Sequence, residues 1–236
     1  MKNSLKIVLV ILTIGLVSCN GNVNIGSGNI ITEKRSITEG FDKIDASTGI
    51  NVIVTQGNLQ EIVVETDDNV MKYVVTKVEN GVLIIKLKQN TNTMSSIDVK
   101  VQMPKIAGLE ASSGATIDTR NTLRGTSISL KSTSGSDINA MLEYENVSCE
   151  TSSGSTVTIS GKALQLQTNS SSGSDIDANE LVTNEAFSKA SSGSGTRVNP
   201  IVKLDAHASS GSTIEYVKIP KKLIKIESSG GSVDKD

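Results

Sequence analysis

Ser112-Ser113-Gly114, Thr133-Ser134-Gly135 and Ser152-Ser153-Gly154 are the first copies of a short phrase that decides the fold of this chain. The later copies are Ser171-Ser172-Gly173, Ser191-Ser192-Gly193, Ser209-Ser210-Gly211 and Ser229-Gly230-Gly231. With the last Gly of each copy taken as the mark, successive copies are 18 to 21 residues apart. A period in this range is typical of a solenoid, in which each repeat buries its apolar side against its neighbours.

Aliphatic and small hydroxyl side chains recur at every second position around each Gly. One such series is Ile128, Leu130, Ser132, Ser134, Ser136, Ile138 and Ala140, and similar series run through 147–159, from Leu164 to Ala178 and from Leu204 to Ile214. Period two indicates extended strands with one face turned inward. We therefore expect these series to fill the interior, with Ser113, Ser134, Ser153 and Ser172 stacked in a file. Inward hydroxyls would bond to the backbone or to each other, because buried polar groups need partners.

These patterns predict an all-β fold, namely a right-handed parallel β-helix-like solenoid with coils of 18–21 residues. A left-handed β-helix of hexapeptides would hold the coil length near a multiple of six, and the observed scatter does not. A flexible Ser/Gly linker is the other alternative, but linkers lack strict alternation and buried aliphatic partners.

The first 18 residues have the composition of a signal peptide. Lys2 and Lys6 precede an apolar run, 7–17, which is shorter than the roughly 20 residues that a membrane-spanning helix needs. The run ends in Leu16-Val17-Ser18-Cys19, which resembles the lipobox of bacterial lipoproteins. That resemblance implies cleavage before Cys19 and lipid attachment to its thiol; a secreted protein with a chance cysteine is the alternative. Residues 19–29 would then be the lipidated Cys and a flexible tether.

Residues 30–110 contain fewer Gly and Ser and more long aliphatic side chains than the repeats. Within them, Ile44–Val54 shows the same alternation, with Thr48-Gly49 in place of Ser-Gly, and we interpret it as the first coil. Asp67-Asp68-Asn69 precedes an apolar pattern that predicts a short capped helix, ended by Asn80-Gly81.

Two alternating segments, Val82–Lys88 and Ile97–Met103, read as strands. We expect the helix and these strands to cap the open N-terminal end of the solenoid, which otherwise exposes an unpaired edge. The predicted domain is therefore 30–236, with the first coil and the cap in 30–110 and the Ser-Ser-Gly coils in 111–236.

Composition narrows the range of functions. The chain has 23 basic and 25 acidic residues and no basic run, so nucleic acid is not an expected partner. Lipid on Cys19 leaves Cys149, at an inward position, as a small core residue, and no disulfide framework exists. The single His, His207, falls at an outward position in another coil. Trp is absent, and we expect Phe187 and Tyr144 to pack at corners and not to serve as sugar-stacking platforms.

The chain also resembles a known family, the head GIN domain of putative auto-transporter adhesins, which is common among Gram-negative lipoproteins. Gly49-Ile50-Asn51 matches the motif that gives the family its name, and the residues around it are also similar: Arg35, Phe41, Ile44, Gln56-Gly57, Met103-Pro104, Leu109 and the Ser-Ser-Gly ladder. The resemblance covers roughly Ile30 to Gly231. It implies a right-handed β-helix-like fold and a cell-envelope location, and it carries no catalytic residues to transfer.

Outward residues two and four places after each Gly form two columns. They are Thr116, Asp137, Thr156, Asp175, Gly195 and Thr213, and Asp118, Asn139, Thr158, Asp177, Arg197 and Glu215. The strip of Asp118, Asp137, Asp175 and Asp177 is the candidate for calcium binding or for the carboxylates of a polysaccharide lyase or hydrolase. A hard cation needs six or more converging oxygens, and a hydrolase needs two carboxylates in unequal environments. Thr and Asn interrupt the strip, so we interpret it as a solvated face and assign no catalytic, cofactor or metal residue.

These observations predict a non-enzymatic lipoprotein of the cell envelope that presents a rigid β-solenoid as an adhesin or scaffold. Cys19 would anchor it to the membrane, and Asn20, which is not the Asp that marks inner-membrane retention in some lipoproteins, favours the outer membrane. A glycan or an envelope protein is the expected partner, and a homo-oligomer is a further possibility. A polysaccharide-active enzyme on a β-helix is the alternative function.

Overall fold

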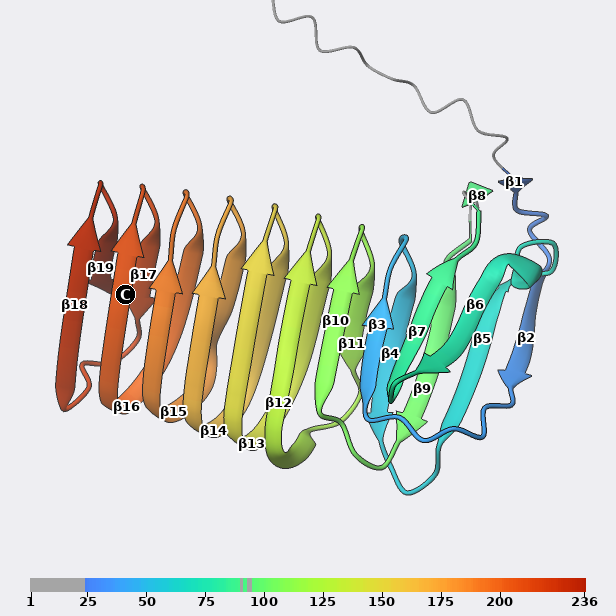
Figure 1. Cartoon of the computed structure of the whole chain (residues 1–236), viewed down its shortest axis with the longest axis horizontal. Helices are drawn as coiled ribbons and strands as arrows, with labels where there is room; N and C mark the ends of the chain where they lie inside the picture. Colours follow the sequence, from blue (N-terminus) through green and yellow to red (C-terminus); the bar gives the residue numbers. More distant parts are fainter. Residues whose placement is uncertain (1–23, 90, 93–94) are drawn as a thin grey trace, which may run out of the picture.

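The computed structural model describes residues 24–89, 91–92 and 95–236, which form a β-solenoid of about seven turns (Figure 1). The N-terminal strands are β1 (Asn24–Ile25), β2 (Ile30–Arg35), β3 (Lys43–Ala46), β4 (Asn51–Gln56), β5 (Glu61–Asp67), β6 (Val74–Glu79), β7 (Val82–Leu87), β8 (Thr91–Asn92) and β9 (Asp98–Met103). The repeat strands are β10 (Gly108–Ser112), β11 (Thr116–Thr119), β12 (Leu123–Thr133), β13 (Asp137–Ser152), β14 (Thr156–Ser170), β15 (Asp175–Ala190), β16 (Gly195–Ser209), β17 (Thr213–Tyr216), β18 (Lys222–Ser228) and β19 (Ser232–Lys235).

Each coil has two long sides joined by a tight turn at one end and a wide bend at the other. The strands β13 to β16 pass round the wide bend, so the first half of each lies on one side and the second half on the other. All neighbouring repeat strands pair in parallel, with Asp137 opposite Thr156 on one side and Ser148 opposite Gln167 on the other. In Figure 1 the near sides run upward while the chain steps from right to left, which makes the winding right-handed. The predicted fold class is therefore confirmed.

The tight turn explains why Ser-Gly recurs. In Ser153-Gly154, both residues have left-handed backbone angles, with φ of 56° and 68°. The same pair of angles occurs at Thr48-Gly49, so the segment Ile44–Val54 forms a coil as predicted. Gly adopts this conformation without strain. The residue before it is also left-handed, and this position favours a small polar side chain such as Ser or Thr.

The turn serines do stack in a file, but their side chains face outward. The N–H groups of Gly114 and Gly135 donate to the Ser134 and Ser153 carbonyls of the next coil at 3.2 and 3.1 Å. Ser113, Ser134, Ser153 and Ser172 are nevertheless exposed, so the prediction that they fill the interior was wrong. The left-handed pair turns both side chains to solvent, which simple alternation does not anticipate.

The buried hydroxyls belong to the residues on either side of the turn. Ser136, Ser155, Ser174, Ser194 and Ser212, each next after the turn Gly, are at most 3% exposed. Ser155 accepts the Ser152 N–H at 3.2 Å, and its hydroxyl lies 2.6 Å from the Ser132 carbonyl oxygen of the preceding coil. One hydroxyl thus closes its own turn and ties two coils together. The rest of the interior is aliphatic, with Ile138, Leu130 and Val157 fully buried.

Two details of the predicted repeats differ in the structure. Leu164, expected inside, is 51% exposed, because the wide bend places Ala163 inward at 7%. In the last copy the turn is Ser229-Gly230, with φ of 48° and 76°, so Gly230 and not Gly231 continues the series. Gly231 takes the place of the buried serine, where a Cβ would lie 2.4 Å from the Ala208 carbonyl carbon.

The N-terminal region caps the stack and is interleaved with it. The coil β3–β4 pairs on one side with β10 and β11 and on the other with β7 and β9, all in parallel. Beyond them, β6, β5 and β2 add antiparallel strands that end the stack (Figure 1). The predicted cap over this end is confirmed, including the strands within Val82–Lys88 and Ile97–Met103.

The expected capped helix in the cap is a single 3₁₀ turn, η1 (Met71–Tyr73), with no side-chain N-cap bond. The following residues form β6, which folds back on β7 through Asn80-Gly81, where both residues have positive φ. Asp68 instead accepts hydrogen bonds from Ser27 and Asn29, which lower the pKa of its carboxyl group. The described end of the predicted tether is thus bonded to the cap.

Candidate functional site

The back face of the solenoid carries the two columns that the sequence predicts. Asp137 pairs with Thr156 and Thr156 with Asp175, while Asp118 pairs with Asn139. The four predicted carboxylates therefore lie in two adjacent columns, separated by Thr and Asn. At about 4.8 Å per coil, Asp137 and Asp175 are roughly 10 Å apart.

Two of these four carboxylates, Asp118 and Asp177, have side-chain partners on the same face. Asp118 accepts a hydrogen bond from the Asn139 amide at 2.9 Å. Arg197 lies 3.6 Å from Asp177 and bonds Glu215 at 2.9 Å, and this bond raises the pKa of its guanidinium. The structure thus ties this face together with lateral bonds between coils.

No other arrangement of reactive groups is visible in the described part of the chain. No set of three or more His, Cys, Asp or Glu residues there could hold a metal ion. Cys149 is a buried core residue as predicted, and burial raises the pKa of its thiol, which keeps it protonated. His207 lies on the other face and bonds Asp205 at 2.9 Å.

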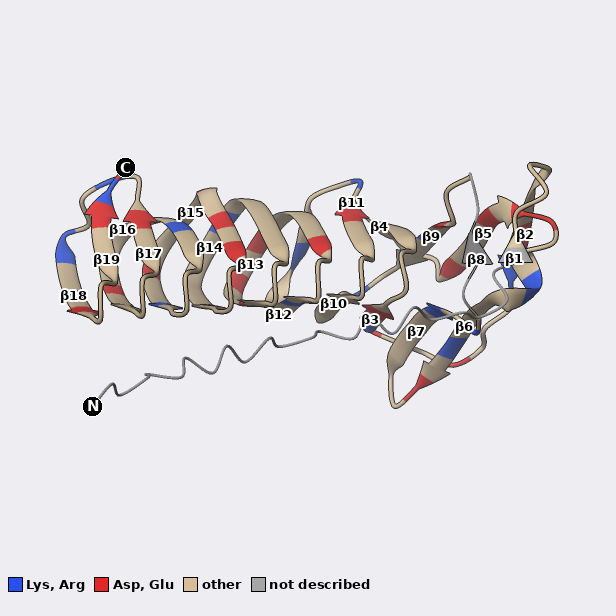
Figure 2. Cartoon of the chain, turned by 90° about the horizontal axis from the view of Figure 1, so that it is seen from above, with Lys and Arg blue, Asp and Glu red and all other residues tan. Residues whose placement is uncertain are grey.

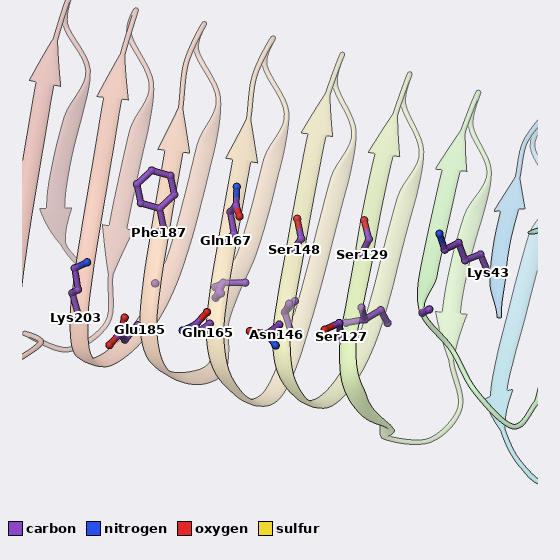
Figure 3. A pocket seen from close by; sticks show the side chains of 15 residues that line it. Lys43, Ser127, Ser129, Asn146, Ser148, Gln165, Gln167, Glu185, Phe187 and Lys203 are labelled. Carbon is purple, nitrogen blue, oxygen red and sulfur yellow. The ribbon is translucent and has the colours of Figure 1, made fainter.

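The front face, nearest the viewer in Figure 1, contains a groove of about 520 Å³ that runs across the coils (Figure 3). Its two walls are columns of outward side chains, held one above another by the parallel register. The lower wall consists of Ser127, Asn146, Gln165, Glu185 and Lys203, and the upper wall of Ser129, Ser148, Gln167 and Phe187. We call this feature the front groove.

The middle of the front groove consists of neutral polar side chains that have no partner in the protein. Ser127, Ser129, Asn146, Ser148, Gln165 and Gln167 make no side-chain hydrogen bond to any residue that the structure describes. On the back face, by comparison, several polar groups are bonded to one another, as Asn139 and Asp118 show. Amide and hydroxyl groups that are free of partners and aligned in columns can form hydrogen bonds with a ligand.

The two ends of the front groove differ from its middle. At one end Lys43 lies across Gly108, where a Cβ would be 3.3 Å from the lysine Cγ. At the other end stands Phe187, whose ring centroid is 5.6 Å from that of His207 at an angle of 59°. Phe187 is therefore an outer-face residue, and its expected packing at a corner was wrong. Tyr144 does pack at a corner, where its hydroxyl donates to the Ile106 carbonyl at 2.8 Å.

One ion pair between charged residues lies above the front groove. Lys131 bonds Glu110 at 2.8 Å, which raises the pKa of the Lys131 ammonium. Burial and the neighbouring Glu110 raise the pKa of the Asp45 carboxyl. Acidic and basic positions are interspersed along the solenoid (Figure 2). The front groove itself, in contrast, has a middle stretch of neutral polar side chains that can form new hydrogen bonds.

The front groove was not predicted from the sequence, because the outward columns considered there lie only after each glycine. Residues eight and six places before the glycines of the turns give both of its walls, for example Asn146 and Ser148 before Gly154. The family motif Gly49-Ile50-Asn51 has a structural explanation: Gly49 is left-handed, Ile50 is fully buried and Asn51 bonds Asp98 at 3.0 Å. Cys19, the predicted lipid attachment site, lies outside the described residues.

The fold places the chain among the right-handed β-solenoid proteins, and comparison with known families identifies the family. The family model described as "Putative auto-transporter adhesin, head GIN domain" matches residues 40–220. The chain belongs to this family, as its motifs suggested. This membership points to an adhesin-like protein of the cell envelope or surface. No curated protein matches the chain.

Solved structures share the fold at low sequence identity. A "putative adhesin" from Bacteroides fragilis NCTC 9343 has a TM-score of 0.83 and 17% identity, over 90% of this chain and 99% of that chain. A "putative lipid binding protein" from Parabacteroides distasonis ATCC 8503 has a TM-score of 0.72 and 17% identity, over 90% of this chain and 98% of that one. A "putative adhesin" from Parabacteroides merdae ATCC 43184 has a TM-score of 0.70 and 18% identity, over 90% and 98%. Among the residues described here, no helix is long and apolar enough to cross a membrane.

Proposed function

We propose that this protein is a non-catalytic lipoprotein that is anchored to the outer membrane through Cys19 and presents its β-solenoid for adhesion or scaffolding. The contrast between the two faces carries the proposal. Back-face groups such as Asp118, Asp177 and Arg197 are bonded to neighbours, whereas the polar groups of the front groove have none. A surface whose ligand-facing groups are preformed and unpaired suits binding, while catalysis needs reactive groups in unequal environments.

The anchor is supported by the sequence 16–19, which resembles a lipobox. The tether and the cap would then hold the solenoid away from the membrane, with both long faces accessible to a glycan or to another envelope protein. Self-association into a homo-oligomer stays a prediction.

The polysaccharide-active alternative would place acid and base on the back face, at Asp175 and Asp177. These carboxylates face one side of β15 about 7 Å apart, a separation that an inverting hydrolase could use. Against it, Asp177 is close to Arg197, and the Asp175 carboxylate lies over Gly195, where a Cβ would be 2.4 Å from Oδ1. The surrounding surface is open, so water would reach both groups alike.

The test compares the full chain with its Cys19→Ser variant in a Gram-negative host. We expect palmitate labelling and outer-membrane fractionation of the wild type, and loss of both in the variant. Cells that display the wild type should adhere to mucin-coated or fibronectin-coated surfaces more than cells without it. Labelling that persists in the variant, or adherence that does not depend on the protein, would contradict the proposal.

A further inference from the structure

We infer that the front groove binds an extended neutral glycan that lies across the coils, with one sugar residue opposite each coil. This inference rests on the proposed binding function and names its ligand class. The inference starts from the periodicity of the two walls. In each wall an amide or hydroxyl side chain without a partner recurs once per coil, at a spacing of about 4.8 Å. This spacing is close to the length of one pyranose ring along an extended β-linked chain.

The chemistry of the walls favours sugar hydroxyls. Asn146, Gln165 and Gln167 each offer an amide donor and acceptor, and Ser129 and Ser148 offer hydroxyls. Paired donors and acceptors match vicinal hydroxyl groups, which both donate and accept. The register of β12 to β15 fixes the backbone positions from which these side chains project, so only their rotamers need to be ordered when a ligand binds.

The end of the groove at Phe187 adds a stacking surface. Phe187 follows Gln167 in the upper wall, and its ring is half-buried against His207, which Asp205 holds at 2.9 Å. Lys189 lies 5.2 Å from the ring centroid. Aromatic faces pack against the C–H groups of sugar rings, so Phe187 would contact the sugar residue at this end of the chain (Figure 3).

Other ligand classes fit the front groove less well. A peptide strand would need unpaired backbone groups, but the strands here are paired on both sides. An acyl chain would cover the amides of the walls without supplying hydrogen bonds, which carries a desolvation penalty. A polyanion would find Lys43 and Lys203 only at the ends, with Glu185 beside Lys203.

The experiment uses the full chain in detergent and isothermal titration with cellohexaose, xylohexaose, laminarihexaose and chitohexaose. Gln165→Leu and Gln167→Leu remove hydrogen bonds and keep similar volume, and each should weaken binding about fivefold to tenfold. Phe187→Ala should weaken it by a similar factor. Asn169→Leu is the matched control, because Asn169 is exposed on the front half of β14 but outside the front groove, and it should bind like the wild type.

Each outcome decides between the possibilities. Binding that the groove variants weaken and Asn169→Leu does not supports the inference. Binding unchanged in the groove variants, or binding only to polygalacturonate or to phosphatidylglycerol vesicles, overturns it. If no hexasaccharide binds while cells still adhere, the inference fails and the proposed function survives. If reducing ends are released from a hexasaccharide, the non-catalytic proposal itself fails.

Discussion

Ser155→Ala tests the claim that the hydroxyl after each turn glycine holds the coils together. Ser155 is 1% exposed. Its Oγ accepts the Ser152 N–H at 3.2 Å and lies 2.6 Å from the Ser132 carbonyl and 2.9 Å from the Ser152 carbonyl. Alanine would leave the buried N–H of one coil and the carbonyl of the coil below without this partner. A buried hydrogen-bonding group that loses its partner costs about 1 to 3 kcal/mol, so we expect a loss of stability in this range.

The assay is urea unfolding followed by circular dichroism, with Ser153→Ala as the control. Ser153 lies two residues earlier and its side chain is exposed, so its replacement should change the free energy of unfolding by less than about 0.5 kcal/mol. With a slope near 2 kcal/mol per molar urea, Ser155→Ala should lower the midpoint by about 0.5 to 1.5 M. Because a solenoid can unfold in parts, hydrogen exchange at the Ser152 amide supplies a local measurement.

Equal stability of the two variants, or unchanged protection of the Ser152 amide in Ser155→Ala, would refute the role assigned to the Ser155 hydroxyl. Either result would mean that the aliphatic side of each coil supplies the cohesion and that the hydroxyl file only fills space.

Three further predictions concern single residues. Gly161→Ala should destabilise the fold by on the order of 3 kcal/mol, measured by urea unfolding, because φ is 114° and a Cβ would lie 2.1 Å from the Leu142 carbonyl oxygen; unchanged stability would contradict this geometry. Burial raises the pKa of Tyr144 from 10 to about 12, so the folded state holds its proton longer than the unfolded state and stability should fall as pH rises from 10 to 12. In Tyr144→Phe the part of this loss of stability that comes from Tyr144 ionisation should vanish, while the hydrogen bond to Ile106 is lost at every pH. A pH profile of stability identical to that of the wild type would contradict the prediction. The Cys149 thiol, buried and protonated, should react with a disulfide reagent only after unfolding, and rapid labelling of the folded chain would show that the core is open.

The coils and their register could be predicted because one rule, alternation about a fixed turn, repeats many times. The columns at Asp137 and Asp118 came from counting residues after each glycine, and parallel pairing preserves that count from coil to coil. The rule does not describe the turn itself, where two left-handed residues in succession point both side chains outward. It therefore placed Ser134 inside together with Ser132 and Ser136, and only the latter two are buried.

The cap was harder to predict because its residues follow two patterns at once. Acidic residues before Val70 imitate a helix N-cap, whereas Asn80-Gly81 between β-branched residues is a strong hairpin signal. The hairpin forms because β6 can pair with β7. This strand pairing stabilises the segment more than a short isolated helix could, because such helices are marginally stable in water. The front groove could not be predicted because it is defined by polar side chains without partners, such as Gln165 and Gln167. Whether a side chain has a partner depends on residues that are close in space but distant in the sequence.

The interleaving of β3–β4 between β7–β9 and β10–β11 imposes an order on biosynthesis. If the chain is exported as proposed, its amino end enters the cell envelope first; the earliest rung then has no template on either side, and it stays incomplete until Met103 has emerged and β9 can pair with β4. From then on, every further 18 to 21 residues find a finished platform on which to dock. Assembly should therefore have one slow start near the amino end, followed by rapid growth in a single direction.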